Sequence, residues 1–466
     1  MRFDRLIVEV EKMSSHVVDL KMLQNNFSTE EMRNIWNDEN RLQKILDVEA
    51  ALALAESELG VIPKEAGEVI ANAANIKYFD IPDIAEQAVK LKHSLMATIE
   101  KLQSLAGDYG EYVHFGATTQ DVTDTGTILQ LKEAHHIILR DAKEVARLLV
   151  DLASQYKHTP MAGRTHGMQG LPTTFGFKMA VVLSEFERHL ERLHSLEKRV
   201  FTGVLSGGVG TYAALGSIGP QVEDNSLQRL GLNTPDICWH SSRDRISEYG
   251  SVLGLISGSL GKLGNEFYNL MRTEINEVEE PFQAGNVGST TMPHKRNPAM
   301  FEGIASLTKP VLHSVSLLHE SLVTEHERDA MSWRAEWVAL PEICLYLSAQ
   351  LKSTIAVLKG LHVKQENMLK NLHMQNGLLL SEQIMFALSD ELGKQTAHHI
   401  VYELAMKAFE ENISFKTLLK EDAKVRKVLS EQQIDELLDP EKYIGLAAQK
   451  VENVIHSITS RGLLDE

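Results

Sequence analysis

The chain has 466 residues, of which 43% are hydrophobic, and its formal net charge is −17. A chain of this length exceeds a single typical hydrophobic core, so we expect two or three structural units. The acidic balance argues against nucleic acid as a partner, because a phosphate backbone is bound by clustered Lys and Arg, but it does not exclude small anionic substrates.

The cysteines and the N-terminal segment indicate a reduced compartment. Cys238 and Cys344 lie far apart in the sequence and form no disulfide framework. The segment MRFDRLIVEVEK carries charge throughout, so we expect no signal peptide, and no uncharged stretch is long enough to cross a bilayer. We therefore expect a cytoplasmic protein with no membrane partner.

Long stretches without proline predict long helices. Residues 83–159, 236–280 and 342–439 contain no proline, and an interior proline costs a helix about 3 kcal/mol. Strands with alternating apolar and polar residues are scarce. Residues 1–112 predict a first helical unit, which includes the strongly helical stretch LDVEAALALAESELG.

Residues 114–121 (HFGATTQD) precede a predicted long helix. Hydroxyl groups at a helix N-terminus cap free amides and, together with those amides, bind anions. An ordinary helix cap with a well-placed Asp is the alternative interpretation. The helix that follows carries an apolar stripe formed by Leu131, Ile138, Ala142, Val145, Leu149 and Leu152.

A second polar segment, residues 163–169 (GRTHGMQ), places His166 between glycines in a predicted loop before another long helix. Imidazole titrates near neutral pH, so His166 is a candidate acid or base, although an isolated histidine is more often structural. The stripe of the following helix consists of Met179, Val182, Phe186 and Leu193.

Residues 208–213 (GVGTYA) are similar to a dinucleotide-binding fingerprint but lack the βαβ pattern around it, so we expect a tight loop between helices. A third stripe follows, with spacings that alternate between three and four residues. It consists of Leu253, Ile256, Leu260, Leu263, Phe267 and Leu270. Gly250, Gly254 and Gly258 on the same helix allow a neighbouring helix to approach closely.

Residues 288–298 (GSTTMPHKRNP) combine hydroxyls, two cations and an amide between a glycine and a proline. Lys295 and Asn297 offer the positive charge and the donors that a substrate carboxylate needs. The segment resembles the signature loop of the fumarase/aspartase/argininosuccinate lyase superfamily. Its HKRNP ending is similar to the branch of adenylosuccinate lyases and 3-carboxymuconate cycloisomerases, and the other polar segments resemble the same superfamily.

The resemblance implies an all-α fold with three helical domains, at residues 1–112, 113–364 and 365–466. It also implies that the long central bundle joins those of three other subunits in a twenty-helix tetramer core. Each active site of such a homotetramer draws segments from three subunits, so assembly becomes a condition for activity.

The activity implied is β-elimination from an N-succinyl, aspartate-derived dicarboxylate with release of fumarate, as in the purine-biosynthetic adenylosuccinate lyases, without a cofactor. By resemblance Ser289 abstracts the proton and His166 protonates the leaving nitrogen. The residues implied to bind substrate are His93, His114, Thr118, Thr119, Thr165, Lys295, Asn297 and Arg328.

Several alternatives remain beside this interpretation. The N-terminal segment SSHVVDLKML lacks the Arg-Tyr pair with which adenylosuccinate lyases grip the nucleotide phosphate, and other segments favour a 3-carboxy-cis,cis-muconate cycloisomerase-like enzyme. A lens-crystallin-like structural role is disfavoured by the intact catalytic groups. We expect no metal site, because no HExxH or cysteine-paired ligand spacing occurs, and no hydrolase, because no GxSxG elbow occurs.

Overall fold

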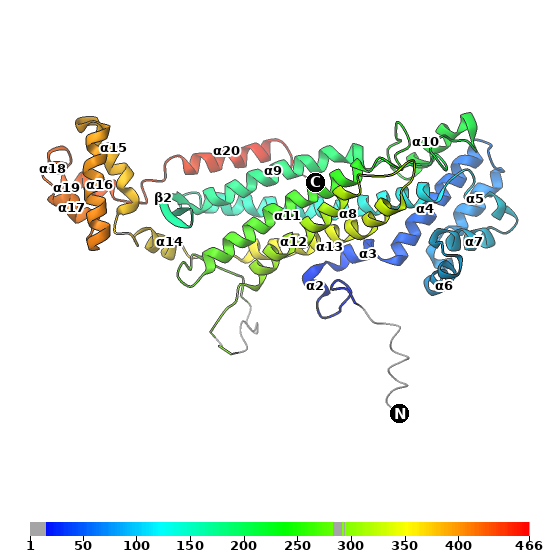
Figure 1. Ribbon diagram of the computed structural model, residues 1–466, viewed down its shortest axis with the longest axis horizontal. Helices are drawn as coiled ribbons and strands as arrows, with labels where there is room; N and C mark the ends of the chain where they lie inside the picture. The colour runs from blue at the N-terminus through cyan, green and yellow to red at the C-terminus, as the bar shows by residue number, and fades with distance from the viewer. Residues whose placement is uncertain (1–14, 283–290, 293, 466) are drawn as a thin grey trace, which may run out of the picture. The chain divides into compact units, whose positions relative to one another are not determined.

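The computed structural model describes residues 15–282, 291–292 and 294–465, and this part of the chain is predominantly helical (Figure 1). The predicted all-α class is confirmed. The described β-structure is limited to two short two-stranded antiparallel sheets.

Contacts divide the chain into two compact units. Unit 1 consists of residues 1–142, 189–261 and 306–352, and unit 2 of residues 143–188, 262–305 and 353–466. The predicted three-domain division stays a prediction.

Five long helices each contribute one part to unit 1 and another part to unit 2. Their bounds are α8 (Thr119–Gln155), α9 (Phe175–Val200), α11 (Asp244–Met271), α12 (Ala299–Glu320) and α13 (Ala330–Gly360). All three predicted apolar stripes are buried, on α8, α9 and α11. The predicted helices are therefore confirmed, because these are the faces that the bundle covers.

The glycines of α11 bring it close to α12 within unit 1. A Cβ at Gly250 would stand 2.3 Å from Leu318, and one at Gly254 would stand 3.0 Å from Val315. Gly258 does not serve this contact, because a Cβ there would meet nothing within 4 Å, whereas one at Gly261 would stand 2.1 Å from Thr308. The predicted close approach is thus correct at two of its three glycines.

Two of the long helices contain proline: Pro310 lies inside α12 and Pro341 inside α13. A prediction of long helices from stretches without proline therefore misses these two helices. The lost helical hydrogen bond is offset by tertiary packing, since Leu307, Val311 and Leu340 around the two prolines are buried.

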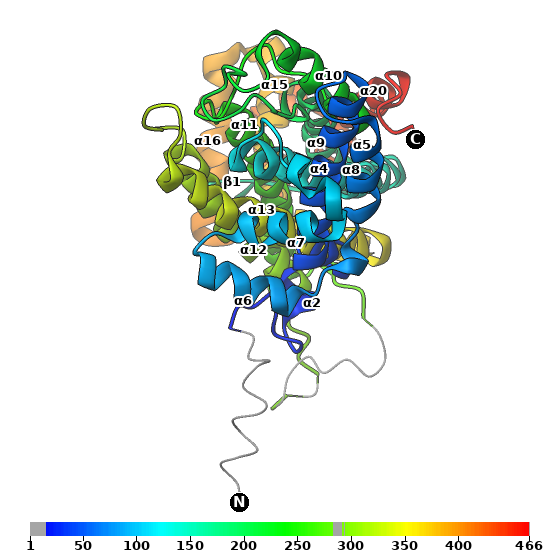
Figure 2. The same ribbon diagram turned by 90° about the vertical axis from the view of Figure 1, so that its right-hand side faces the viewer.

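The remaining helices of unit 1 are α2 (Gln24–Phe27), α3 (Glu30–Ile35), α4 (Asp38–Glu58), α5 (Lys64–Ala73), α6 (Ile81–Leu91), α7 (Ser94–Ala106) and α10 (Gly219–Arg229). The 3-10 helices of unit 1 are η2 (Ile76–Tyr78), η3 (Gly107–Tyr112) and η4 (Gly216–Ile218). Helix α4 packs against α5 and α10, and α6 packs against α7 (Figure 2). Side chains at the helix starts accept backbone amides, as Asn37 does for α4 and Asp80 for α6.

Unit 2 contains the strands β1 (Pro160–Thr165), β2 (Met168–Thr174), β3 (Val278–Glu279) and β4 (His362–Val363). Its remaining helices are α14 (Gln365–Leu372), α15 (Ser381–Leu392), α16 (Lys394–Glu411), α17 (Phe415–Glu421), α18 (Val425–Val428), α19 (Glu431–Leu437) and α20 (Ala447–Ser460), with the 3-10 helix η5 (Leu378–Leu380).

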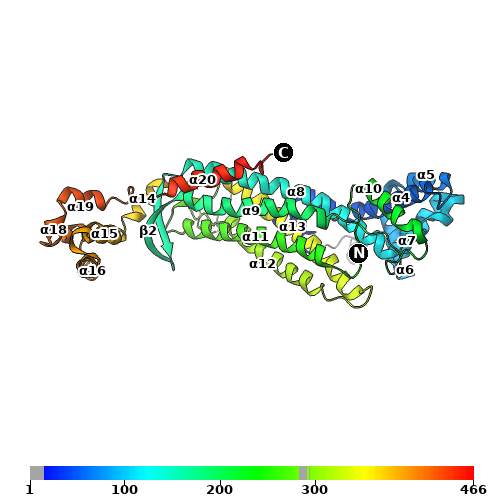
Figure 3. The same cartoon turned by 90° about the horizontal axis from the view of Figure 1, so that it is seen from above.

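Helix α20 lies along the part of α9 that belongs to unit 2 (Figure 3). The contact is polar, because Ser457 donates a 2.6 Å hydrogen bond to Glu187. Helices α15 to α19 share an apolar cluster that includes Ile384, Ile400 and Phe415. In the part of the chain that the structure describes, no helix has the length and apolar content needed to span a bilayer.

Candidate active site

The residues predicted to form the site are distributed over both units. His93, His114, Thr118, Thr119 and Arg328 belong to unit 1, whereas Thr165, His166, Lys295 and Asn297 belong to unit 2. Ser289 lies outside the described residues.

Asp121 organises the group in unit 1. Its carboxylate accepts the backbone amides of Thr118, Ser206 and Gly207 at 3.0, 3.1 and 2.8 Å, and Oδ1 lies 2.9 Å from His240 Nε2. The side chain is wholly buried, so these hydrogen bonds offset the cost of burying its charge. One carboxylate therefore fixes the start of α8, the Ser206–Gly207 backbone and His240 relative to each other.

His114 is held by a buried carboxylate. Its Nδ1 lies 2.7 Å from Glu49 Oε1, and its backbone is left-handed, with φ 63°. Burial by itself lowers the pKa of His114, but the hydrogen bond and the charge of Glu49 outweigh it and hold the pKa above its ordinary value. The structure therefore presents His114 as an oriented and readily protonated group.

His93 and Thr119 lie side by side. His93 caps α7 through Nδ1, which accepts the amide of Met96 at 3.2 Å, and its Nε2 lies 3.5 Å from the Thr119 hydroxyl oxygen. The capping bond assigns the acceptor role to Nδ1, so Nε2 carries the proton. The fold thus brings His93 and the start of α8 together.

Arg328 joins this group from a segment distant in sequence. Its Nη2 donates to the Thr118 hydroxyl at 3.0 Å and to the Gly208 carbonyl at 2.7 Å. The carbonyl of Gly208 was not predicted to take part. It belongs to the loop that the sequence predicted between helices, and that loop is confirmed, with left-handed backbone at Gly207, Gly210 and Tyr212.

His166 stands at the turn of the β1–β2 hairpin in unit 2, where the sequence predicted a loop. Thr165 pairs with Met168, so His166 and Gly167 form a two-residue turn with φ of 54° and 79°. Positive φ at both positions matches the twist of a tight hairpin. The loop prediction is correct at His166 and Gly167 but missed the strands on either side, because these short strands lack apolar alternation. Thr165 and His166 are both exposed.

An ion pair with a buried carboxylate holds this hairpin close to its turn. Arg164 donates to both oxygens of Glu277, at 3.0 and 2.7 Å, and Glu277 also accepts the Asn371 side-chain amide at 2.8 Å. The carboxylate of Glu277 is fully buried. A bidentate pair of this kind fixes orientation as well as position, so it sets the direction of the exposed turn.

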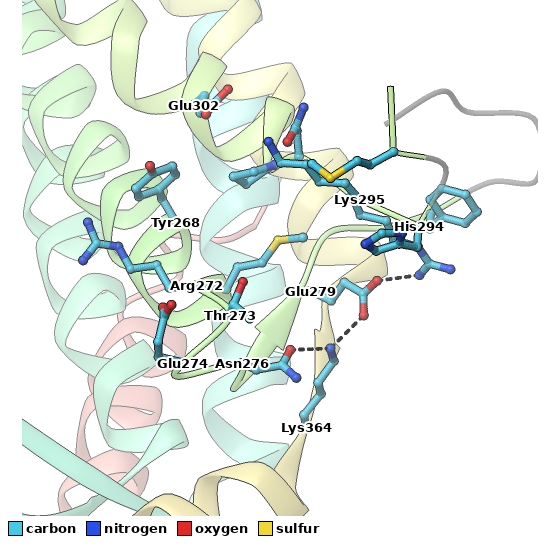
Figure 4. Close-up of a pocket in the computed structure, with 16 residues that line it drawn as sticks. Tyr268, Arg272, Thr273, Glu274, Asn276, Glu279, His294, Lys295, Glu302 and Lys364 are labelled. Atoms are coloured by element: carbon cyan, nitrogen blue, oxygen red, sulfur yellow. Dashed lines mark hydrogen bonds and ion pairs between the residues drawn. The ribbon is translucent and has the colours of Figure 1, made fainter. Parts of the chain in front are cut away.

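Lys295 and Asn297 line a cavity of about 1120 Å³ in unit 2. The cavity lies between the end of α11, the start of α12 and the β3–β4 sheet, and Figure 4 shows Lys295 and His294 on one side of it, with Arg272 directly after the end of α11. Both predicted binding residues are exposed there. The described part of the signature segment thus contributes to a cationic cavity.

An ion-pair network forms one wall of the cavity. Glu279 on β3 pairs with Arg296 and, at 2.8 Å, with Lys364, and Lys364 Nζ also donates to Asn276 at 2.7 Å (Figure 4). Arg296 additionally stacks over Phe282 at 4.0 Å. Lys295 and Arg272 form no ion pair with any carboxylate in the described ranges. Their positive charge faces a cavity that the carboxylates of Glu274 and Glu302 also line.

The sequence reasoning missed several residues of this cavity. Glu302 in the first turn of α12 contributes a carboxylate, and Arg272 and Lys364 contribute cations. Glu302 follows Asn297 by five residues. An acidic residue soon after a cationic segment was the available signal. Arg272 and Lys364 gave none, because they are brought here only by folding.

Within the described ranges, no three His, Cys, Asp or Glu side chains are grouped so that they could hold a metal ion.

Comparison with protein families gives two matches. A family model described as "Lyase" matches residues 25–312, and one described as "Adenylosuccinate lyase C-terminus" matches residues 377–454. Among solved structures, the chain is similar to the 3-carboxy-cis,cis-muconate lactonizing enzyme from Pseudomonas putida. Identity to that structure is 35%, the TM-score is 0.89, and the match covers 94% of this chain and 99% of the other.

Two relatives match over their entire length. An N-acetyl-S-(2-succino)cysteine lyase from Enterococcus italicus is 60% identical over 97% of this chain and 100% of the relative. The protein of the same name from Dickeya dadantii is 57% identical over the same shares. An adenylosuccinate lyase from Pyrococcus horikoshii is 40% identical, over 96% of this chain and 98% of the relative.

These identities correct the functional expectation. The expected adenylosuccinate-type carbon–nitrogen lyase is wrong, because the adenylosuccinate lyase is far less similar than the two relatives at 60% and 57%. The cycloisomerase alternative fails on the same comparison. The segments that led to the expectation resemble sequences common to the whole superfamily, so they do not distinguish its members by the group that leaves.

Proposed function

This chain is a lyase of the fumarase/aspartase/argininosuccinate lyase superfamily, and from that membership we propose that it cleaves the carbon–sulfur bond of an S-(2-succino)cysteine, releasing fumarate. The N-acetylated compound is the leading substrate. The observation that carries the proposal is the identity of 60% and 57% to two N-acetyl-S-(2-succino)cysteine lyases, over 97% of this chain.

The reaction is a β-elimination on the succinyl group. A base removes a proton from the carbon next to one carboxylate, the electron pair forms the double bond of fumarate, and the bond from the neighbouring carbon to sulfur breaks. Sulfur leaves with the bonding electrons as a thiolate, which is then protonated. Because an alkyl thiol has a pKa of about 8.5, the thiolate is a far better leaving group than an amine.

The assignment of base and acid follows from the family. Ser289 is proposed to remove the proton, and His166 to protonate the departing sulfur. A thiolate leaves readily without protonation, so protonation by His166 lowers the activation barrier less here than it would for a nitrogen leaving group. Proton removal becomes the demanding step, since it places a second negative charge on a carboxylate.

The charges of the described residues suit this step. Lys295 and Asn297 face a cationic cavity in unit 2, and in unit 1 the Thr118 hydroxyl is held by Arg328. Donors placed in advance around a developing anion are each worth about 3–4 kcal/mol. We assign these residues, with His93, His114, Thr119 and Thr165, to binding the two carboxylates and the thioether substituent.

The N-terminal region supports a substrate without a nucleotide. Residues 14–23 (SSHVVDLKML) lack the Arg-Tyr pair that adenylosuccinate lyases use for the phosphate. A cysteine derivative has no phosphate to bind, so this departure fits the proposed substrate.

We further propose a cytoplasmic homotetramer with shared active sites, as the family implies. Chains carrying Ser289→Ala and chains carrying His166→Ala should regain activity when mixed and reassembled, because some sites then receive both intact residues. Mixed tetramers that remain as inactive as either variant alone would contradict shared sites.

The proposal is tested by offering the purified protein N-acetyl-S-(2-succino)cysteine and S-(2-succino)cysteine, with adenylosuccinate as the comparison substrate. Fumarate is followed by its ultraviolet absorbance and the thiol by a chromogenic disulfide reagent. We expect fumarate and thiol in equal amounts from the sulfur compounds. Fumarate from adenylosuccinate alone, or fumarate without thiol, would overturn the proposal.

A further inference from the structure

Next to the glycine loop of unit 1 lies a polar group for which the proposed elimination has no use. It consists of Cys238, His240 and Ser206, with Asp121 behind His240. His240 Nε2 lies 2.9 Å from Asp121 Oδ1. The Cys238 thiol lies close enough to His240 and Ser206 for both to act on its titration. The order thiol, imidazole, carboxylate is the arrangement that activates a cysteine.

Two buried atoms in this group point to a charged sulfur. His240 is 3% exposed and Ser206 is 1% exposed. Neither His240 Nδ1 nor Ser206 Oγ has a hydrogen-bond partner among the described residues. A buried polar atom without a partner costs about 1–3 kcal/mol. A Cys238 thiolate accepts from both, so it removes that cost.

The titration of the two groups agrees with this geometry. Burial by itself raises the pKa of the Cys238 thiol, but the interactions of its thiolate with His240 and Ser206 outweigh burial and lower the pKa below its ordinary value. Burial likewise lowers the pKa of His240, whereas Asp121 and Cys238 together raise it to about 9. Tyr212 and Glu223 face the same group, and their own pKa values are raised, first of all by burial, so both stay protonated more readily.

Cys238 also differs from the other thiol in access. It is half-buried and follows the exposed residues Asp236 and Ile237. Cys344 is fully buried on α13, and burial raises its pKa far above the ordinary value. The chain therefore contains one thiol suited to reaction and one suited as an internal control.

We propose that Cys238 is a modification site that takes up a small cysteine-derived thiol by exchange with the corresponding disulfide. The Cys238 thiolate attacks one sulfur of the disulfide, whose sulfur–sulfur bond breaks while a new one forms to Cys238. The second thiol leaves as a thiolate and takes the proton held by His240. The disulfide supplies the oxidising equivalents, so no other reactant is needed.

The adduct affects the candidate active site because Gly210 lies against Cys238. A Cβ at Gly210 would already stand 2.3 Å from Cys238 Cβ and 2.6 Å from Sγ, so a larger sulfur substituent has no room on this side. Displacement of the glycine loop moves the Gly208 carbonyl, which accepts Arg328 at 2.7 Å. Modification thus disturbs a substrate-binding residue. The link to a cysteine-derived thiol rests on the proposed function, whose product is such a thiol.

The test exposes the full-length protein to N,N′-diacetylcystine, the disulfide of N-acetylcysteine, and follows its intact mass. We expect one adduct, located at Cys238 by peptide mapping, with Cys344 unmodified. Fumarate release should fall by about tenfold or more, in line with the loss of a substrate-binding contact, and dithiothreitol should restore it. Cys238→Ser should take up no adduct and should keep its activity in the presence of the disulfide.

The mass readout does not depend on turnover, so it tests the proposal even if the proposed substrate is wrong. No adduct, or an adduct on Cys344, would overturn the modification site. Full activity of the modified protein would overturn its link to Arg328. His240→Asn should slow the labelling. In the unaltered protein the labelling rate should stop rising below about pH 8.5, whereas the rate of an unassisted thiol still rises with pH there.

Discussion

The two groups of candidate site residues are held in contrasting ways. In unit 1 the exposed and half-buried candidate residues are held by buried carboxylates. Asp121 accepts a hydrogen bond from the start of α8, and Glu49 contacts His114. In unit 2 the described candidates are exposed, at the hairpin turn and on the rim of the cationic cavity. Buried carboxylates contact the first group directly, whereas the second projects from a hairpin held by the buried Glu277 and from a cavity wall that contains the Glu279–Arg296 ion pair.

The contrast indicates a division of labour. A buried carboxylate must keep all its donors, so the residues it holds cannot move without a large cost. Exposed side chains on turns change position at little cost. We therefore expect substitutions in unit 1 to change stability and substrate binding, and substitutions in unit 2 to change the rate of the chemical step.

The largest effect is expected at Ser289. Ser289→Ala removes the proposed base, so kcat should fall by about 10²–10⁴-fold while KM and the free energy of unfolding stay nearly unchanged. Steady-state fumarate release and chemical denaturation measure the two quantities. Normal turnover in this variant would show that another group is the base.

A large loss of stability is expected at Asp121. Asp121→Asn leaves His240 without its charged partner in a buried place, so the free energy of unfolding should fall by about 3–5 kcal/mol. Urea denaturation measures it. Asp244→Asn is the matched control, because this Asp also stands in the first turn of a long helix but is exposed.

The control should lose less than about 1 kcal/mol, the usual worth of an exposed charge near a helix end. Equal losses in the two variants would remove the proposed role of Asp121 as the anchor of unit 1.

Substitution of Glu56 should raise the free energy of unfolding by an amount that depends on pH. Its carboxylate is buried without a hydrogen-bond partner among the described residues, and burial, followed by the charge of Glu49, raises its pKa from 4.5 to about 9. The folded chain therefore holds this proton more tightly than the unfolded chain. The stability that the protonated Glu56 carboxyl contributes is fully present below its pKa in the unfolded chain. It is lost as the pH rises through its pKa in the folded chain.

Glu56→Gln should then be more stable than the unaltered protein by at least about 1 kcal/mol near pH 8, and the difference should vanish near pH 4.5. Thermal unfolding at several pH values measures it. Glu58→Gln, two residues further along α4 and exposed, should show no such trend. A constant difference across pH would mean that Glu56 stays ionised.

The smallest effect is expected at His166. His166→Gln should lower kcat by less than about tenfold for a substrate with an aromatic thiol, because that thiolate leaves without protonation. The loss should grow as the pKa of the leaving thiol rises. A series of S-succinyl thiols of increasing pKa measures this slope, and a loss that is equal for all thiols would remove the acid role of His166.

Local pattern was sufficient for the helices and for part of the site. Periodicity located the buried faces of α8, α9 and α11, because a helix repeats its contacts every three or four residues and a short window of sequence records them. The family was readable for a similar reason. Residues 288–298 and 114–121 each concentrate the necessary donors in one continuous segment.

Only tertiary structure decided the rest. The β1–β2 hairpin and the proline-containing helices α12 and α13 depend on packing that no local window contains. Arg328 meets Thr118 across 210 residues of sequence, and His240 meets Asp121 across 119. A contact between distant segments leaves no local periodicity, because its partners are chosen by the fold and not by their neighbours in the chain.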